Sequence, residues 1–296
     1  AKIPASRQLM PLAFACGWGG IITMVGTPPN IIATGALKAA GLPTFSFFEF
    51  AWIGIPLSLA GMLYMMFIGK YLLPKVELSA DQEIAQEIEA KTTSTSKQMI
   101  SGLILLLVVV TMAIGIPGIT LEMAAVIGAI VCVLTGCLTE KQAYGSIDWV
   151  TIFLFAGMMP IATSMDKTGA GALIADWTVG LMGGTPSPMV VTAVLFLLSC
   201  TLTQFMSNTA ASALLCPIGL AIAKQLGADP KAVVMAIAVA ASCAFATPVG
   251  TPPNTLVLGP GNYKFMDYVK AGVPLVIVSF IVSIIIIPMV WPFFPA

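Results

Sequence analysis

The residues of this chain that could do chemistry carry hydroxyls, amides and freed backbone groups, and they gather in three short segments. The string Gly-Thr-Pro-Pro-Asn occurs twice, at residues 26–30 and 250–254. A third segment, Ser-Asn-Thr at residues 207–209, lies between two apolar runs. Neutral oxygen atoms of this kind can coordinate a small hard cation, and helix N-termini can bind a small anion. The three segments together are the candidate site.

Each Gly-Thr-Pro-Pro-Asn string interrupts an uncharged stretch that otherwise has the composition of a membrane helix. Proline has no amide hydrogen and disfavours helical geometry in the residue before it, so Thr-Pro-Pro breaks a helix and frees backbone carbonyls. In a bilayer such groups persist only where they are buried in protein or line a water-filled cavity. Two matched breaks in one membrane chain therefore indicate the binding site of a transporter.

The composition predicts an all-α polytopic membrane protein. Hydrophobic residues make up 58% of the 296 residues and charged residues only 9%, against roughly 25% charged residues in soluble domains. The chain has no histidine and no net charge, which argues against His-based catalysis, His-ligated metal and nucleic-acid binding. The six cysteines stand singly in apolar stretches, as small buried side chains do. We therefore expect no enzyme activity and no cofactor.

The gaps between charged residues outline the membrane spans, because a helix needs about 20 apolar residues to cross the hydrocarbon core. One stretch, residues 177–223, is too long for a single helix, and its two apolar parts are short for full crossings. We expect a re-entrant helical hairpin with residues 207–209 at its tip; the alternative is one tilted span plus a surface helix. The uncharged stretches are 8–37, 50–69, 98–121, 123–139, 149–165, 177–223, 232–263 and 271–296.

The two strings belong to a longer internal similarity. When Gly26 is aligned with Gly250, further matches follow in the same order: residues 47–50 resemble 265–268, and residues 54–56 resemble 272–274. The separation between the Ser-Asn-Thr segment and the second string is longer than the whole stretch of sequence before the first string. The counterpart of Ser-Asn-Thr in the first copy would therefore lie before Ala1. We therefore expect the chain to lack its N-terminal part, which would carry a second Ser-Asn-Thr tip.

The distribution of basic residues predicts that the two copies are inverted. With residues 70–97 placed in the cytoplasm, residues 2–7 and 262–270 are also inside, whereas residues 41–49, both ends of the hairpin and the C-terminus are outside. The two breaks then run in opposite directions, as in inverted-repeat transporters. Nine Lys or Arg lie inside on this tracing (Lys2, Arg7, Lys70, Lys75, Lys91, Lys97, Lys141, Lys264, Lys270) and four outside (Lys38, Lys167, Lys224, Lys231).

These residues resemble the divalent anion:sodium symporters, which include the INDY-type dicarboxylate transporters. The similarity rests on Ser-Asn-Thr at a hairpin tip, followed by Thr-Pro-Pro at 251–253 in an interrupted helix, and on the matching break at 26–30. It covers essentially the whole chain in element order. The resemblance implies homodimers that work by an elevator mechanism, with residues 1–75, 189–258 and 271–296 in a moving transport domain and residues 98–165 in a scaffold.

Four segments follow along the chain. Residues 1–75 end the first repeat with its broken helix and the following span. Residues 76–97 alternate charged and apolar side chains at helical spacing, which predicts an amphipathic cytoplasmic linker helix. Residues 98–188 hold the scaffold and dimerisation helices of the second repeat plus an interfacial helix. Residues 189–296 hold the re-entrant hairpin, the second broken helix and the last span.

The resemblance also implies which residues bind sodium. The backbone carbonyls of Thr203, Met206 and Gly250, together with the side-chain oxygen of Asn208 and with Ser207, would form one sodium site. Gly26 would contribute to a second sodium site, whose other half lies outside this chain.

An anion would have to bind without basic side chains, because no Lys or Arg falls near the predicted midplane. Asn208 and Thr209 start the second limb of the hairpin, where the helix dipole favours anions. The dipeptides Thr27-Pro28 and Thr251-Pro252 would close the pocket from the two broken helices. The bound sodium ions would supply the positive charge, so anion affinity should depend on sodium.

The sequence favours a secondary active transporter that couples sodium to the uptake of C4-dicarboxylates or related divalent anions. One alternative keeps the fold but works as a sodium-independent anion exchanger, and another is an ion channel with a continuous pore. We expect an integral protein of a bacterial inner (cell) membrane, with its C-terminus outside. Its partners would be a small dianion, sodium ions, lipid and a second copy of the chain, and no nucleic acid.

Overall fold

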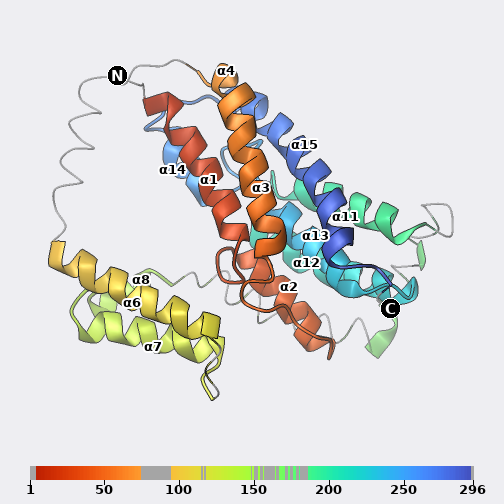
Figure 1. Ribbon diagram of the computed structural model, residues 1–296, viewed down its shortest axis with the longest axis horizontal. Coiled ribbons are helices and arrows are strands. Elements are labelled where there is room, and N and C mark those ends of the chain that lie inside the picture. Colours follow the sequence, from red (N-terminus) through yellow and green to blue (C-terminus); the bar gives the residue numbers. More distant parts are fainter. Residues whose placement is uncertain are drawn as a thin grey trace. The chain divides into compact units, whose positions relative to one another are not determined.

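The computed structural model describes residues 5–74, 95–114, 116, 118–147 and 186–294, and between 148 and 185 only residues 149, 153, 156, 164, 167–170, 173, 176, 177 and 180. The described residues contain helices and no strand (Figure 1). The elements are η1 (Ala5–Arg7), α1 (Leu9–Ile21), α2 (Pro28–Ala39), α3 (Ala51–Tyr64), the π-helix η2 (Met65–Gly69), α4 (Lys70–Leu72), α6 (Thr95–Ile114), α7 (Leu121–Leu134), α8 (Glu140–Gly145), α11 (Pro188–Leu202), α12 (Asn208–Gln225), α13 (Pro230–Ser242), α14 (Pro252–Leu258) and α15 (Phe265–Val290).

The chain divides into two compact units. The first unit combines Ala1–Leu78 with Thr151–Ala296 and contains all three segments of the candidate site. The second unit is Ser79–Val150, in which α6 packs against α7, and α8 begins with a capping box between Thr139 and Gln142. The predicted linker helix at 76–97 lies almost wholly outside the described residues, as does most of the predicted interfacial segment before residue 186.

Both predicted helix breaks are present. Helix α1 ends shortly before the first Gly-Thr-Pro-Pro-Asn string, and α2 starts at Pro28. Helix α13 ends before the second string, and α14 starts at Pro252. Proline is tolerated at these first helical positions because the missing amide would have had no partner inside the helix. The preceding threonines have nearly the same extended backbone, with φ −148° and ψ 142° at Thr27 and φ −149° and ψ 145° at Thr251.

The two halves also repeat a contact between the break and the next long helix. A Cβ added at Gly54 in α3 would lie 2.8 Å from Ile22 Cα, and one added at Gly272 in α15 would lie 2.7 Å from Ala246 Cα. Ile22 and Ala246 correspond when the two strings are aligned, and the two glycines begin the matching segments 54–56 and 272–274. The similarity seen in the sequence is therefore repeated in the packing, while the inverted orientation of the copies stays a prediction.

The predicted hairpin consists of α11 and α12, joined by residues 203–207. The 15 residues of α11 span about 22 Å at 1.5 Å per residue, less than the roughly 30 Å of a hydrocarbon core. Both limbs pack against α13, and Ser199 Oγ donates a hydrogen bond of 2.9 Å to the Ile237 carbonyl. The hairpin is thus held by protein along its length, and its re-entry into the membrane stays a prediction.

Helix α13 is the centre of the first unit. Every residue from 232 to 241 is buried, and the helix packs against α1, α2, α11, α12 and α15. Apolar residues cover all of its faces, which is typical of a helix surrounded by protein. Three helical segments among the described residues are long and apolar enough to cross a membrane: Ala51–Leu72, Ser96–Ile114 and Phe265–Val290. The two of these in the first unit contain α3 and α15, which pack on each other.

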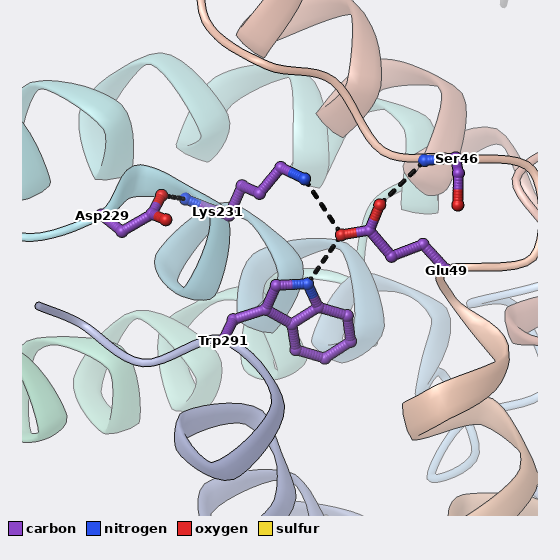
Figure 2. A network of polar contacts seen from close by, with 5 residues as sticks. All are labelled: Ser46, Glu49, Asp229, Lys231 and Trp291. Atoms are coloured by element: carbon purple, nitrogen blue, oxygen red, sulfur yellow. Dashed lines mark hydrogen bonds and ion pairs between the residues drawn. The ribbon is translucent and has the colours of Figure 1, made fainter. Parts of the chain in front are cut away.

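A half-buried polar cluster ties together three loops at one end of the first unit (Figure 2). Glu49 Oε1 accepts hydrogen bonds from Lys231 Nζ at 3.0 Å and from Trp291 Nε1 at 2.8 Å. Glu49 Oε2 accepts a bond of 2.9 Å from the Ser46 amide. The Lys231 amide in turn donates to Asp229 Oδ1 at 2.8 Å. The charge tracing assigns all of these loops to the same side of the membrane, and the structure brings them together.

A second cluster gathers the loops that the tracing assigns to the other side. Tyr263 Oη donates to the Ser6 carbonyl at 2.6 Å and accepts from the Met10 amide at 2.8 Å. Ser6 Oγ donates to the Pro74 carbonyl at 3.0 Å. Pro74 and Glu49 flank the helical segment Ala51–Leu72, so the two clusters lie at its opposite ends. The grouping of loops is as predicted, and which group faces the outside stays a prediction.

Protonation of the Glu49 carboxyl makes the stability of the fold depend on pH. Burial by itself would raise the pKa of Glu49, but hydrogen bonds from Trp291, Ser46 and Lys231, together with the charge of Lys231, hold that pKa below its ordinary value of 4.5. Because the pKa is lower in the folded state, the carboxylate stabilises the fold above pH 4.5, and this stabilisation is lost as the pH falls through the folded pKa.

We expect Glu49→Gln to lower the melting temperature at neutral pH by roughly 2–4 °C, because the variant loses the charged acceptor of three hydrogen bonds. The gap to the wild type should narrow as the pH falls below 4.5 and close once the pH is below the lowered folded pKa of Glu49, where the wild-type carboxyl is protonated too. The measurement is thermal unfolding in detergent across a pH series. Glu140→Gln, at the exposed start of α8, is the control. A gap that stays constant down to strongly acid pH would contradict the assignment.

Candidate functional site

The hairpin tip rests on the end of α13 and on the unwound residues of the second break. Gln204 at the tip donates through Nε2 to the Cys243 carbonyl at 3.0 Å, and its Oε1 accepts from the Ala246 amide at 2.9 Å. Thr247 Oγ1 donates to the Gln204 carbonyl at 2.7 Å and accepts from the Gly250 amide at 3.1 Å. The side chain of Gln204 thus takes up the backbone groups that the broken helix leaves free.

The Asn208 amide lies where the tip, α13 and the second break converge. One of its two terminal atoms is 2.7 Å from Thr203 Oγ1, 3.2 Å from the Ala241 carbonyl and 2.8 Å from the Gly250 carbonyl. Thr203 Oγ1 also donates to the Ala241 carbonyl at 2.6 Å. Three oxygen atoms from three different segments therefore face one end of a single side chain.

This convergence has two chemical interpretations, set by the rotation of the amide. With Nδ2 toward the cluster, its two hydrogens can be donated to Thr203 Oγ1 and the Gly250 carbonyl while the Thr203 hydroxyl donates to the Ala241 carbonyl, so the cluster is satisfied without an ion. With Oδ1 toward the cluster, four neutral oxygens face one another, which is a ligand set that suits a hard cation. The orientation of one amide therefore decides whether the cluster is closed by hydrogen bonds or presents four oxygens to one another.

Gly250 must be a glycine for this approach. A Cβ at this position would lie 2.9 Å from the Thr203 carbonyl oxygen and 2.9 Å from Ala244 Cβ. The Thr203 carbonyl, one of the predicted sodium ligands, therefore lies directly against the second break. Of the predicted sodium set, Thr203, Asn208 and Gly250 lie together, but Thr203 faces Asn208 with its hydroxyl and not with the predicted carbonyl. Ser207 Oγ is engaged instead as the N-cap of α12, where it accepts from the Ala210 amide at 3.1 Å.

The first break has a similar close backbone approach, but its glycine differs in burial from that of the second break. A Cβ at Gly26 would lie 2.2 Å from the Gly20 carbonyl oxygen, and Gly20 and Ala244 occupy matching positions in the aligned copies. Gly250 is buried under the hairpin tip, whereas Gly26 is exposed. Gly26 lies apart from the Asn208 cluster, and its role in a second sodium site stays a prediction.

The predicted anion-binding residues lie at the start of α12 and at the two breaks. Helix α2 packs against α12 and α13, and Thr27 Oγ1 lies 3.3 Å from Ser242 Oγ at the end of α13. Thr209 is buried in the first turn of α12, while Pro28 and Pro252 are both exposed. No hydrogen bond found in the described part of the chain engages the Thr251 hydroxyl. The two break threonines therefore differ: the Thr27 hydroxyl faces a serine of α13, and the Thr251 hydroxyl makes no hydrogen bond among the described interactions.

The sequence reasoning missed three contributors. The Ala241 carbonyl belongs to an apolar residue in the middle of an apolar helix, so no side-chain signal could reveal it. Gln204 and Thr247 could have been found, since Gln204 is an amide in an otherwise apolar run and Thr247 precedes a proline near the second string. Met206, whose backbone carbonyl is a predicted ligand, is partly buried, and its role stays a prediction.

Comparison with known proteins places these features in a family. The chain matches the CitMHS family model, described as a citrate transporter, over residues 1–215 and again over residues 173–295. The transporter YfbS of Escherichia coli, named as uncharacterized, is 48% identical over 169 residues, which is 55% of this chain and 27% of that protein. An uncharacterized transporter of Haemophilus influenzae is 32% identical over 304 residues, 96% of this chain and 62% of that protein.

A more distant relative has a name that states an activity. The sodium-dependent dicarboxylate transporter SdcS of Staphylococcus saprophyticus is 24% identical over 310 residues, 96% of this chain and 58% of that protein. The resemblance to divalent anion:sodium symporters is confirmed by these matches. The chain spans between 27% and 62% of the length of these curated relatives.

We expect Gly250→Ala to destabilise the protein by about 1–3 kcal/mol, because the added methyl group would overpack against the Thr203 carbonyl and Ala244. Thermal unfolding in detergent measures the effect. Gly259→Ala is the matched control, since nothing lies within 4 Å of a Cβ at that position. Equal melting temperatures for the two variants would contradict the close approach of tip and break.

Proposed function

Because this chain belongs to the citrate transporter family, we propose that it forms part of a sodium-coupled symporter of C4-dicarboxylates or related divalent anions. The observation that carries the proposal is the convergence of Thr203, Ala241 and Gly250 oxygens on the Asn208 amide. The cluster is made of neutral groups only, and neutral oxygens at the ends of broken helices are the ligands that sodium-coupled transporters use. The distant SdcS relative supports the same coupling ion and substrate class.

Sodium binding would prepare the anion site. With Oδ1 of Asn208 turned toward the cluster, a sodium ion would link the hairpin tip to the second break and bring a positive charge to the start of α12. The N-terminal turn of that helix, with Asn208 and Thr209, would then bind one carboxylate. Thr27-Pro28 and Thr251-Pro252 would bound the anion from the two breaks. Anion and sodium transport would be coupled because the positive charge that attracts the anion is present only after sodium has bound.

The movement that carries the site across the membrane would be of the elevator type, in a homodimer. Residues 1–75, 189–258 and 271–296 would form the moving transport domain, and residues 98–165 the scaffold. The packing of the hairpin, α1, α2 and α15 around α13, with α3 packed on α1 and α15, supports a domain that moves as a body. We place the protein in a bacterial inner membrane, with the cluster of Glu49, Lys231 and Trp291 on the outer side.

One observation favours a second candidate, the sodium-independent exchanger. With Nδ2 of Asn208 toward the cluster, all three oxygens are satisfied by hydrogen bonds and no ion is needed. An exchanger of the same fold would use this state to bind anions throughout its cycle. The two candidates differ in whether the amide turns when sodium is present.

Uptake by the full-length protein in proteoliposomes tests the proposal. We expect uptake of at least one anion from a panel of succinate, malate, tartrate, citrate and sulfate to rise with external sodium. Asn208→Ala should raise the sodium concentration for half-maximal uptake about tenfold or more, because it removes one side-chain ligand. Thr209→Ala should weaken the anion more than sodium. The matched control is Thr201→Val in α11, whose hydroxyl bonds only within its own helix.

Other outcomes point to the alternatives. Equal uptake in sodium and in choline medium, with anion counterflow preserved, would replace symport with exchange. A large single-protein conductance would indicate a channel. Unchanged sodium dependence in Asn208→Ala, with normal uptake by the wild type, would remove Asn208 from the sodium site.

A further inference from the structure

The asparagines that end the two Gly-Thr-Pro-Pro-Asn strings are fully buried and make matching contacts. Asn30 in α2 and Asn254 in α14 each have 0% exposure. Asn30 Nδ2 donates to the Thr23 carbonyl at 2.9 Å and to the Ile21 carbonyl at 3.4 Å. Asn254 Nδ2 donates to the Thr247 carbonyl at 2.9 Å and to the Ala244 carbonyl at 2.8 Å. In both halves the side chain of the second half-helix thus bonds back to the end of the first.

The match extends to one acceptor of each asparagine, whereas the second acceptors, Ile21 and Ala244, are offset by one residue in the aligned copies. Thr23 and Thr247 correspond in the aligned copies, since each stands three residues before the glycine of its string. The asparagines also share a defect, because Oδ1 of each is buried without a hydrogen-bond partner. An unpaired buried acceptor is costly. In both halves, the unpaired Oδ1 accompanies an Nδ2 whose two hydrogens are directed at carbonyls across the break.

A broken helix needs such donors. The last carbonyls of α1 and α13 have no partner inside their own helices, and the prolines that open α2 and α14 supply no amide hydrogens. In the described part of the chain, no backbone hydrogen bond ends on the Gly26 or Gly250 carbonyl. The asparagines therefore take up carbonyls that precede the glycine of each break and leave the glycine carbonyl without a backbone partner; the Gly250 carbonyl faces the Asn208 amide.

We propose that Asn30 and Asn254 are positioning residues that determine which carbonyls of each break are offered to sodium. The inference rests on the proposed function and adds to it two residues that do not touch the ion. Each asparagine fixes the half-helices of its break relative to each other, so the Gly26 and Gly250 carbonyls point away from the hydrogen-bonded side. Removing the amide would let the unwound segment relax and would disperse the oxygen atoms that face the ion.

The predicted effect is specific to sodium. We expect Asn254→Ala and Asn254→Asp each to raise the sodium concentration for half-maximal stabilisation and for half-maximal uptake about tenfold, while maximal uptake at saturating sodium stays within about twofold. A tenfold change corresponds to about 1.4 kcal/mol, the scale of one buried hydrogen bond. Asn30→Ala and Asn30→Asp should do the same through the first break. The aspartate variants keep the shape of the side chain but lose the donors.

The experiment uses the full-length protein, with sodium-dependent thermal stabilisation in detergent beside sodium-dependent uptake in proteoliposomes. Thr34→Val is the matched control, because the Thr34 hydroxyl bonds only to the Asn30 carbonyl one turn back in α2. Its sodium half-saturation should equal that of the wild type.

The outcomes separate this inference from the proposed function. A wild-type protein that sodium neither stabilises nor activates would overturn both. A sodium-responsive wild type with unchanged half-saturation in the four variants would overturn only the positioning role. Loss of folded protein in all four variants, even at saturating sodium, would also overturn it, since the asparagines would then serve folding alone.

Discussion

A helix that is interrupted inside a membrane must satisfy the backbone groups that the interruption frees, and this constraint shapes the first unit. Water is not available in the hydrocarbon core, so each freed carbonyl needs a donor from the protein or an ion. Side-chain amides supply most of the donors here: Gln204 bonds to the end of α13, and Asn30 and Asn254 bridge their own breaks. The carbonyls that these amides leave open are the ones available for chemistry. The hydrogen bonds that satisfy the freed backbone groups therefore hold the first unit together and also determine which carbonyls remain open in the candidate site.

Helix α13 provides the packing on which these hydrogen bonds depend, because it is enclosed by α1, α2, α11, α12 and α15 and ends where the second break begins. Its small and branched residues allow both limbs of the hairpin, α2 and α15 to approach closely. Close approach brings side chains such as Ser199 and Thr203 onto its carbonyls, and it brings the hairpin tip onto the residues where the helix ends. A helix with larger side chains would hold its neighbours further away, and the oxygens of three segments would not converge on Asn208.

Local signals in the sequence predicted the breaks, the hairpin, the grouping of loops at two ends and the family. These signals sufficed because a proline, a charge or an apolar stretch affects mainly the segment that contains it. The long-range partners were not predictable. Nothing in the sequence pairs Glu49 with Lys231 and Trp291, since the three residues are brought together only by the packing of α3, α13 and α15. The role of the Ala241 carbonyl was not predictable for a related reason. It is a backbone group, and only the tertiary fold decides which backbone groups remain open. The N-cap role of Ser207 was hidden because a hydroxyl at a helix start suits a cap and an ion equally well.

The contact between Thr27 and Ser242 makes the two walls of the proposed pocket unlike each other. The hydroxyl of Thr27 has a serine neighbour at 3.3 Å, while that of Thr251 has none among the described hydrogen bonds. The string at 250–254 is also buried at its glycine, and the string at 26–30 is open there. A molecule with two identical ends would therefore meet two different surfaces in the proposed pocket, yet its two orientations there would be equivalent. In an anion whose ends differ, the two orientations would differ in energy, and the unlike walls would favour one of them.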